Sequence, residues 1–276
     1  MIEIGKYNIL TILRQTSVGL YLSDNDDEDV LLPNKYCPED FEINDKIEVF
    51  VYLDYAERKI ATNINPKIYL HEFALLEVTD VTDIGAFLDW GLEKELLVPF
   101  SEQKQKMEEG RWYIVFLDLD TKTNRLFASN KINKYLNNES LTVKPNEEVD
   151  LLILKKTDLG FSVIINNKHK GLIFSNNIFR DLNIGEKTKG YVKNIRPDNK
   201  IDISLQPIGY KNYKNTNSEL IYNKLKASKF LEITDKSSPE EIYSTFGISK
   251  KIFKKSIGDL YKQKKIIILP NGIKLT

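Results

Sequence analysis

The chain has 276 residues, of which 41% are hydrophobic and 29% are charged, and its 40 basic residues balance its 40 acidic ones. No apolar run approaches the roughly 18 residues that a membrane-spanning helix needs, so no membrane contact is expected. Cys37 is the only cysteine, which excludes an intrachain disulfide and favours the reducing cytoplasm.

A block of about 45 residues occurs three times in residues 1–206, which identifies a repeated module. In each copy, apolar residues alternate with other residues in short runs, and Gly, Asn, Asp or Pro separates the runs, as half-buried strands require. The strands are expected at residues 17–22, 30–33, 47–52 and 58–62 in the first copy, 83–88, 95–99, 112–116 and 125–129 in the second, and 158–163, 170–175, 188–193 and 200–204 in the third.

Four or five short strands in about 65 residues, with a glycine inside the second, are typical of a small closed barrel, because glycine permits a sharp strand bend. We therefore expect each copy to form an OB-type barrel of five strands. The predicted barrels are residues 1–65, 66–140 and 141–210.

In the third run given above for each copy, which is the fourth of the five expected strands, alternation predicts one inward-facing valine, at Val51, Val115 and Val192. The next residue then faces outward. Two of these residues, Tyr52 and Phe116, are aromatic and are expected to pack between modules.

After Pro207 the pattern changes from strand to helix, and residues 211–276 are predicted to form a winged helix. Apolar residues recur at helical spacing, Ser238 and Pro239 favour a helix start, and Pro270-Asn271-Gly272 favours a hairpin. The expected elements are a linker at 212–217, a helix at 219–225, a helix starting at 237–241, a helix at 250–262, and a hairpin with strands at 265–269 and 273–276.

Several motifs resemble known domains. Gly85-Ala86-Phe87-Leu88-Asp89 and Gly171-Leu172-Ile173-Phe174-Ser175 resemble two stretches of the RNA-binding repeat of small-subunit ribosomal protein S-one. Ser237-Ser238-Pro239-Glu240 and the segment from 247 to 264 resemble the C-terminal signature of the bacterial conserved virulence factor B family. That family combines tandem S-one-type barrels with one winged helix, so the likeness covers the whole chain.

The resemblance implies a mainly β fold, with three tandem OB-type, S-one-like barrels followed by a small α+β winged helix. It also implies cytoplasmic RNA binding linked to post-transcriptional control of gene expression, with no catalytic activity. No cofactor is expected.

The balanced net charge conceals three unequal parts. Residues 1–140 carry 15 basic and 26 acidic residues, a balance of −11, whereas residues 141–210 have +3 and residues 211–276 have +8. Because an acidic surface repels a polyanion, the main RNA contact is expected in the third barrel and the winged helix. The acidic first two barrels are then expected to have a supporting role or to bind a protein partner.

Aromatic side chains are candidates for stacking on unpaired bases, a contact that tolerates any sequence and therefore suits single-stranded RNA of low sequence preference. The alternative is that these rings fill the barrels or the seams between them, as most aromatic residues do. The candidates are Phe87, Trp90, Phe161 and Phe174. Phe161 comes one position before the expected aromatic site, which Ser162 occupies.

Basic side chains are candidates for phosphate contacts. In the barrels these are Arg125, Lys189, Lys193, Arg196 and Lys200. In the winged helix, lysines recur on one flank of the third helix, which in a helix-turn-helix approaches the nucleic acid. They are Lys250, Lys251, Lys254 and Lys255, and the alternative is that they form only a solvated face.

Two other functions remain as alternatives. A winged helix alone also fits a regulator of duplex DNA. A metal-dependent ribonuclease would need carboxylates such as Asp83, Asp89 or Asp118, although these lie in acidic modules that need no such role. The sequence shows no zinc ligand pattern and no phosphate-binding glycine loop, so neither a catalytic residue nor a metal ligand is predicted.

Overall fold

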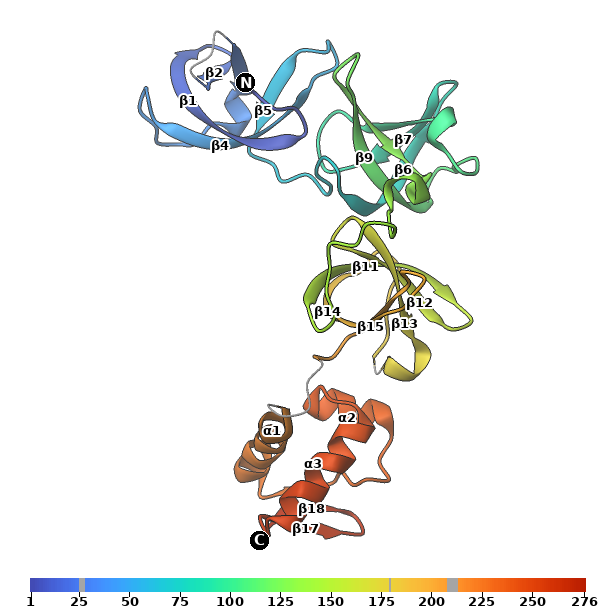
Figure 1. Ribbon diagram of the computed structural model, residues 1–276. Coiled ribbons are helices and arrows are strands. Elements are labelled where there is room, and N and C mark those ends of the chain that lie inside the picture. The colour runs from blue at the N-terminus through green and yellow to red at the C-terminus, as the bar shows by residue number, and fades with distance from the viewer. Residues whose placement is uncertain (25–27, 179, 208–212) are drawn as a thin grey trace. The chain divides into compact units, whose positions relative to one another are not determined.

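The computed structural model describes residues 1–24, 28–178, 180–207 and 213–276 (Figure 1). The chain separates into two compact units, residues 1–136 and 137–276. The first contains two five-stranded modules, and the second contains a barrel and a winged helix. Within the described ranges, no helix is long and apolar enough to cross a bilayer.

The first unit contains two copies of one five-stranded arrangement. Short 3-10 helices follow some of the strands in each copy. The first module consists of β1 (Lys6–Thr16), β2 (Gly19–Ser23), β3 (Asp29–Pro33), η1 (Asn34–Tyr36), β4 (Lys46–Leu53) and β5 (Lys59–Thr62). The second consists of β6 (Phe73–Val81), β7 (Gly85–Asp89), β8 (Leu96–Pro99), η2 (Phe100–Glu102), β9 (Trp112–Asp120), β10 (Arg125–Ser129) and η3 (Ile132–Tyr135).

The two modules differ in how they close. The first is a closed barrel with the strand order β1-β2-β3-β5-β4, in which β3 and β5 pair in parallel. The second has the equivalent order, β10-β9-β6-β7-β8, but remains a five-stranded sheet without a ladder between β8 and β10, whose residues are all described. The predicted barrel therefore forms here without its closing hydrogen bonds.

One glycine position explains why the repeat is visible in the sequence. Gly19, Gly85 and Gly160 open the second strand of each module with φ of +150°, +156° and +145°. A Cβ atom at these positions would lie 2.1, 2.3 and 2.0 Å from a carbonyl oxygen of the neighbouring strand. Only glycine fits so close an approach, since any side chain would displace the paired backbone.

The inward valines are confirmed, because Val51, Val115 and Val192 are all fully buried. Tyr52 also packs between modules as expected. Phe116 does not, since its ring lies 4.8 Å from Phe73 and 3.8 Å from Tyr135, both within the second module. The prediction for Phe116 is wrong because η3 folds back over β9 and covers that face.

An aromatic seam joins the first two modules into one unit. The Trp90 ring centroid lies 6.0 Å from those of Phe50 and Tyr52 on β4, and all three belong to the core of the second module. Edge-to-face packing of this kind adds to the free energy gained by burying the rings. Two aromatic residues of the first module therefore complete the core of the second, while the first module keeps a core of its own.

The second unit begins with a closed barrel of strand order β11-β12-β13-β15-β14. Its elements are β11 (Glu148–Thr157), β12 (Gly160–Ile165), β13 (His169–Phe174), η4 (Ser175–Asn177), β14 (Lys187–Ile195) and β15 (Ile201–Ser204). Asn137 and Asn138 are tied to this barrel, because the Asn137 carbonyl accepts a hydrogen bond from His169 and the Asn138 side chain binds the Lys170 backbone.

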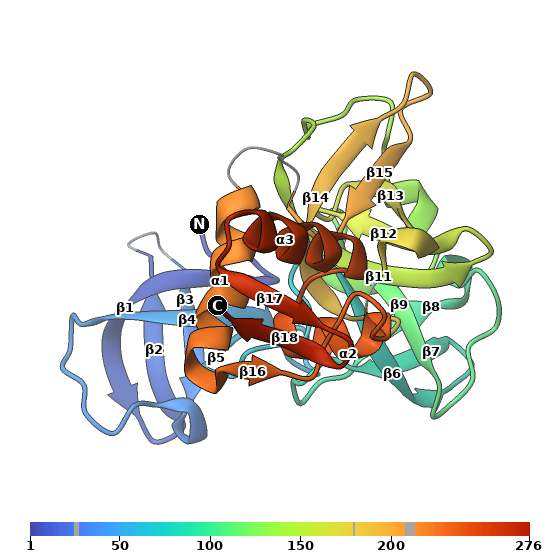
Figure 2. The same ribbon diagram turned by 90° about the horizontal axis from the view of Figure 1, so that it is seen from below.

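The winged helix is confirmed. It consists of α1 (Tyr213–Ser228), β16 (Phe230–Leu231), α2 (Pro239–Phe246), α3 (Lys250–Lys262), β17 (Ile266–Leu269) and β18 (Gly272–Leu275), with sheet order β16-β18-β17. Figure 2 shows α3 beside the β17–β18 hairpin. The Ser238 hydroxyl accepts a hydrogen bond from the Glu241 backbone and Gly247 ends α2 in the left-handed conformation, as the sequence motifs indicated.

The predicted linker at 212–217 is largely wrong. Residue 212 lies outside the described residues, but α1 already starts at Tyr213, well before the expected helix at 219–225. Polar residues in a first helical turn give no apolar periodicity, so the pattern could reveal only the later turns, where Ile221 and Leu225 enter the core.

Candidate nucleic-acid interface

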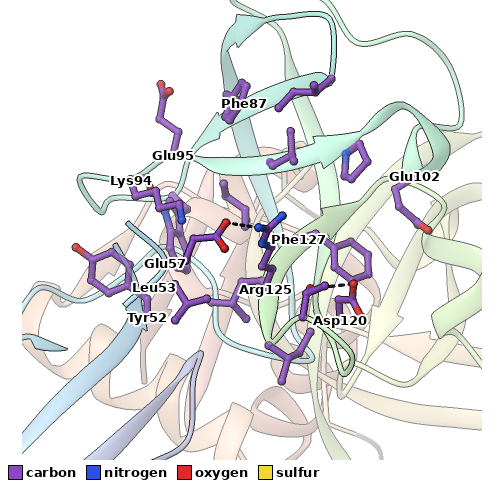
Figure 3. A pocket seen from close by; sticks show the side chains of 18 of the residues that line it. Tyr52, Leu53, Glu57, Phe87, Lys94, Glu95, Glu102, Asp120, Arg125 and Phe127 are labelled. Carbon is purple, nitrogen blue, oxygen red and sulfur yellow. Dashed lines mark hydrogen bonds and ion pairs between the residues drawn. The ribbon is translucent and has the colours of Figure 1, made fainter. Parts of the chain in front are cut away.

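The outer face of the second module carries the expected aromatic platform. On β7, Ala86 and Leu88 point into the core, so Phe87 between them faces outward and is half-buried. By the same alternation, Leu97 on β8 and Phe127 on β10 face the same side. These residues line a pocket of about 830 Å³ that lies over the unpaired junction of β8 and β10 (Figure 3).

Arg125 lies in this pocket but its charge is already engaged. Figure 3 shows Glu57, from the β4–β5 hairpin of the first module, forming an ion pair with the Arg125 guanidinium. The same hairpin is held by Lys94, whose Nζ donates a hydrogen bond to the Asp54 carbonyl at 2.7 Å. Burial lowers the pKa of Lys94. The first module thus supplies one wall of a pocket that otherwise belongs to the second.

Trp90 is not a stacking platform. Its side chain is only 2% exposed, its indole N–H donates to the Lys94 carbonyl, and its ring faces pack in the aromatic seam. The prediction that Trp90 contacts RNA is therefore wrong, because a ring enclosed on both faces offers no surface to a base. The alternative weighed from the sequence, a seam residue, is what the structure shows.

A register shift at the same place in each module shows which residues of the three modules occupy equivalent positions. A register shift interrupts the first strand of each module, and directly after it Arg14 pairs with Tyr21, Asp80 with Phe87, and Lys155 with Ser162. Tyr21, Phe87 and Ser162 therefore occupy the same position. The third barrel has a serine there that is only 4% exposed, with a hydroxyl that has no hydrogen-bond partner among the residues that the structure describes.

Phe161 also departs from its predicted role. It lies on the same side of β12 as Val163 and packs against the core of the third barrel. Since neighbouring positions of a strand face opposite sides, a shift of one residue moved this aromatic ring from the outer face to the core. Phe161 is therefore a core residue of the third barrel and does not form part of the candidate interface.

Phe174 presents a half-buried ring on the outer face of the third barrel. The Arg196 guanidinium carbon lies 5.4 Å from the ring centroid, and Arg196 also binds the Asp202 carboxylate through two nitrogens at 3.0 and 3.2 Å. A planar, carboxylate-bound arginine above an aromatic ring covers that face of the ring and presents its own planar face to a ligand. One face of Phe174 is thus occupied by Arg196.

The other predicted cations of the third barrel lie at its surface. Lys189 and Lys200 each pair with a carboxylate at 2.7 Å, that of Asp150 and Asp198 respectively. Hydrogen bonding to Asp150 raises the pKa of Lys189, which stays charged. Lys193 donates to the Asn177 side chain at 3.5 Å. Exposed ion pairs contribute little free energy, so phosphate can replace these carboxylates at small cost.

The lysines of α3 form the expected flank. Phe253 and Ile257 are buried beneath the helix, whereas Lys251, Lys254 and Lys255 are exposed and Lys250 is partly so. Lys254 lies 3.3 Å from the Asp235 carboxylate, and Lys250 donates to the Lys236 carbonyl. The amphipathic helix therefore places a positive flank on the surface of the winged helix.

Sequence reasoning missed three exposed aliphatic residues that lie at equivalent places. Val18, Ile84 and Leu159 directly precede the glycine that the three modules share and are 53%, 56% and 63% exposed. An aliphatic residue directly before the glycine in all three copies is a pattern that the sequence alone shows. Ile84 lines the pocket beside Phe87, as does Phe127, which the sequence analysis also did not single out.

The carboxylates considered for a nuclease do not come together. Asp89 pairs with Lys67 at 2.5 Å, and Asp118 lies 3.8 Å from His71. Asp83 is exposed in the turn before β7. Among the residues that the structure describes, no group of three or more His, Cys, Asp or Glu side chains is arranged to hold a metal ion.

Comparisons with known proteins agree with this architecture. The S1 domain, named S-one above, matches residues 4–63 and 72–131, and the CvfB-like winged helix domain matches residues 219–275. The fold and its matched domains define a multidomain nucleic-acid-binding protein that combines S1-type barrels with one winged helix. The chain is similar over nearly its whole length to proteins named conserved virulence factor B.

Relatives match over almost the full length. The chain is 27% identical to conserved virulence factor B of Staphylococcus epidermidis RP62A, over 99% of this chain and 95% of that protein. It is 29% identical to the uncharacterized protein YitL of Bacillus subtilis 168, over 95% and 90%. A crystal structure of a multidomain protein with nucleic acid binding domains from Streptococcus pneumoniae covers 99% of this chain and 98% of its own, with 22% identity and a TM-score of 0.42.

Proposed function

We propose that this protein binds single-stranded RNA, with little sequence preference, through its third barrel and its winged helix. It does so in the cytoplasm without catalysis and takes part in post-transcriptional regulation of gene expression. The regulatory part of the proposal rests on the similarity to proteins named conserved virulence factor B.

The lysine flank of α3 is the observation that carries the proposal. It lies in the half of the chain, residues 141–276, that has 25 basic and 14 acidic residues, a balance of +11. Lysines on an exposed helix flank release counterions when they meet phosphates, and that release supplies most of the affinity for a polyanion. Residues 1–140, at −11, repel the same ligand.

The third barrel supports single-stranded rather than duplex RNA. Phe174 and Arg196 together offer a flat surface on which an unpaired base can stack, and bases inside a duplex are not available for such contacts. Lys189 and Lys193, which lie on the same strand β14, support a contact with the RNA backbone. The barrel thus contributes stacking and the winged helix contributes charge.

The test is the salt dependence of RNA binding by the full chain. Fluorescence anisotropy with labelled oligouridine should show affinity falling steeply with salt. A Lys250→Gln/Lys251→Gln variant should lower the slope of log Kd against log salt by about 1 to 2, since each lost phosphate contact removes about 1. Lys104→Gln/Lys106→Gln, with the same charge change on the acidic second module, is the matched control.

An affinity that does not change with salt would count decisively against the proposal. A regulator of duplex DNA is the second candidate, because α3 has the place of a recognition helix. Competition decides between the two ligands. If duplex DNA displaces bound oligouridine more effectively than unlabelled oligouridine does, the protein reads DNA.

A further inference from the structure

The pocket of the first unit has a charge pattern that does not suit RNA. Around the aromatic surface of Phe87 and Phe127 it is lined by four carboxylates and two cations: Glu57, Glu95, Glu102 and Asp120, with Lys94 and Arg125. The unit as a whole, residues 1–136, carries 25 acidic and 15 basic residues, a balance of −10. A phosphate backbone would approach this pocket against a repulsive field.

Both cations of the pocket are committed to protein partners. Arg125 forms its ion pair with Glu57, and Lys94 donates to the backbone carbonyl of Asp54 at 2.7 Å. A phosphate that bound here would have to take Arg125 from a carboxylate that stays next to it. The pocket therefore offers a phosphate only cations that already face a carboxylate or a carbonyl, inside a unit whose net charge is −10.

Two of the carboxylates, Glu95 and Asp120, form no ion pair with a described residue, and the nearby Lys122 charge only adds to the lowering of the Asp120 pKa. The Glu95 carboxylate accepts a hydrogen bond from the Thr79 hydroxyl at 2.5 Å. The Asp120 carboxylate accepts hydrogen bonds at 2.9 Å from the Lys122 backbone and the Thr123 hydroxyl, and these bonds lower the pKa of Asp120. Both are held in place by neutral donors and remain able to bind a cation.

The arrangement of these groups fits an extended ligand. Figure 3 shows Glu95 and Asp120 on opposite sides of the pocket, with Phe127 and Arg125 between them. The apolar stem of an arginine or lysine packs on aromatic and aliphatic surface while its charged end reaches a carboxylate. An arginine also stacks on an aromatic face.

We propose that this pocket binds a basic segment of a protein partner, in an extended conformation that presents arginine or lysine side chains to Glu95 and Asp120 over the surface of Phe87 and Phe127. The charge complementarity selects a basic polypeptide over RNA. This inference concerns the first unit and does not depend on the RNA site proposed for the second.

The test uses the full chain and a short fluorescein-labelled peptide of alternating arginine and serine. The probe should bind at low salt, and the same peptide with glutamate in place of arginine should not. The variant Glu95→Gln/Asp120→Asn keeps both hydrogen-bond acceptors but removes both charges, and should weaken binding about fivefold or more. Phe127→Leu should weaken binding as well, without any change in charge.

The control is Glu39→Gln/Asp40→Asn, which removes two exposed charges from the same unit away from the pocket. It should leave the peptide affinity within about twofold of the parent protein. Equal weakening by the two double variants would show a diffuse charge effect and overturn the proposal. If the pocket variant instead weakens oligouridine as much as the peptide, the occupant is RNA and the proposal is wrong. Thermal melting of each variant confirms that it is folded.

Discussion

Replacement of Phe174 by alanine is the sharpest test of the stacking surface on the third barrel. Arg196 covers one face of the half-buried ring, so at most one base can stack on the ring itself. Stacking on an aromatic side chain contributes about 1–3 kcal/mol per base. We therefore expect Phe174→Ala to weaken oligouridine binding by about 1–2 kcal/mol, or about 5- to 30-fold in Kd.

The same substitution should cost little stability. Phe174 is half-buried and does not belong to the core of the third barrel, so the expected loss is about 1–2 kcal/mol, mostly from its contact with Arg196 and partial burial. Phe161→Ala is the matched control, because that ring packs against the core. It should lower the melting temperature more, while RNA affinity below the melting transition stays unchanged.

Anisotropy titrations at one fixed salt concentration, together with thermal melting, separate the two effects. Unchanged RNA affinity in Phe174→Ala would refute the stacking role. An equal loss of affinity in both variants would show that the effect comes from destabilising the barrel rather than from a lost base contact.

A fragment of residues 137–276 should retain most of the RNA affinity measured by anisotropy, while residues 1–136 should bind weakly; the reverse result would place the site in the acidic unit. Gly85→Ala should lower stability by about 2 kcal/mol or more in denaturant unfolding, because its Cβ would meet the carbonyl of the next strand at 2.3 Å; an unchanged midpoint would contradict this. The hydrogen bond from Lys67 lowers the pKa of Asp89 below its ordinary 3.8, so this contribution to stability is present above that value and lost as pH falls through the folded pKa. Melting of Asp89→Asn should therefore differ from the parent at neutral pH and converge with it in acid.

The repeat and its strands were predictable because they depend on local patterns. Alternation along a strand and the glycine at positions 19, 85 and 160 are imposed by backbone geometry that each module needs for itself. Helix caps such as Ser238 are equally local. Five strands were expected in each module, but the position of the long first strand was not predicted. These strands, β1, β6 and β11, carry register shifts that interrupt the alternation of apolar residues.

Which aromatic rings are exposed was not predictable from one strand. Trp90 is buried because β4 of another module supplies Phe50 and Tyr52 against it. Phe161 lies one position before the outward-facing site of β12 and therefore faces the core. Phe174 occupies an outward-facing position at the end of β13. Burial of a ring depends on what packs over it, and that partner is set by tertiary contacts.

The sequence by itself determined the modules, the winged helix and the charge difference between the two halves, because composition and periodicity are properties of the chain. The tertiary structure alone decided which charges are available to a ligand. Glu57 and Arg125 belong to different modules, and only folding makes them an ion pair that leaves the pocket acidic. The free energy of a charged group depends on its neighbours in space, and those neighbours lie far away in the chain.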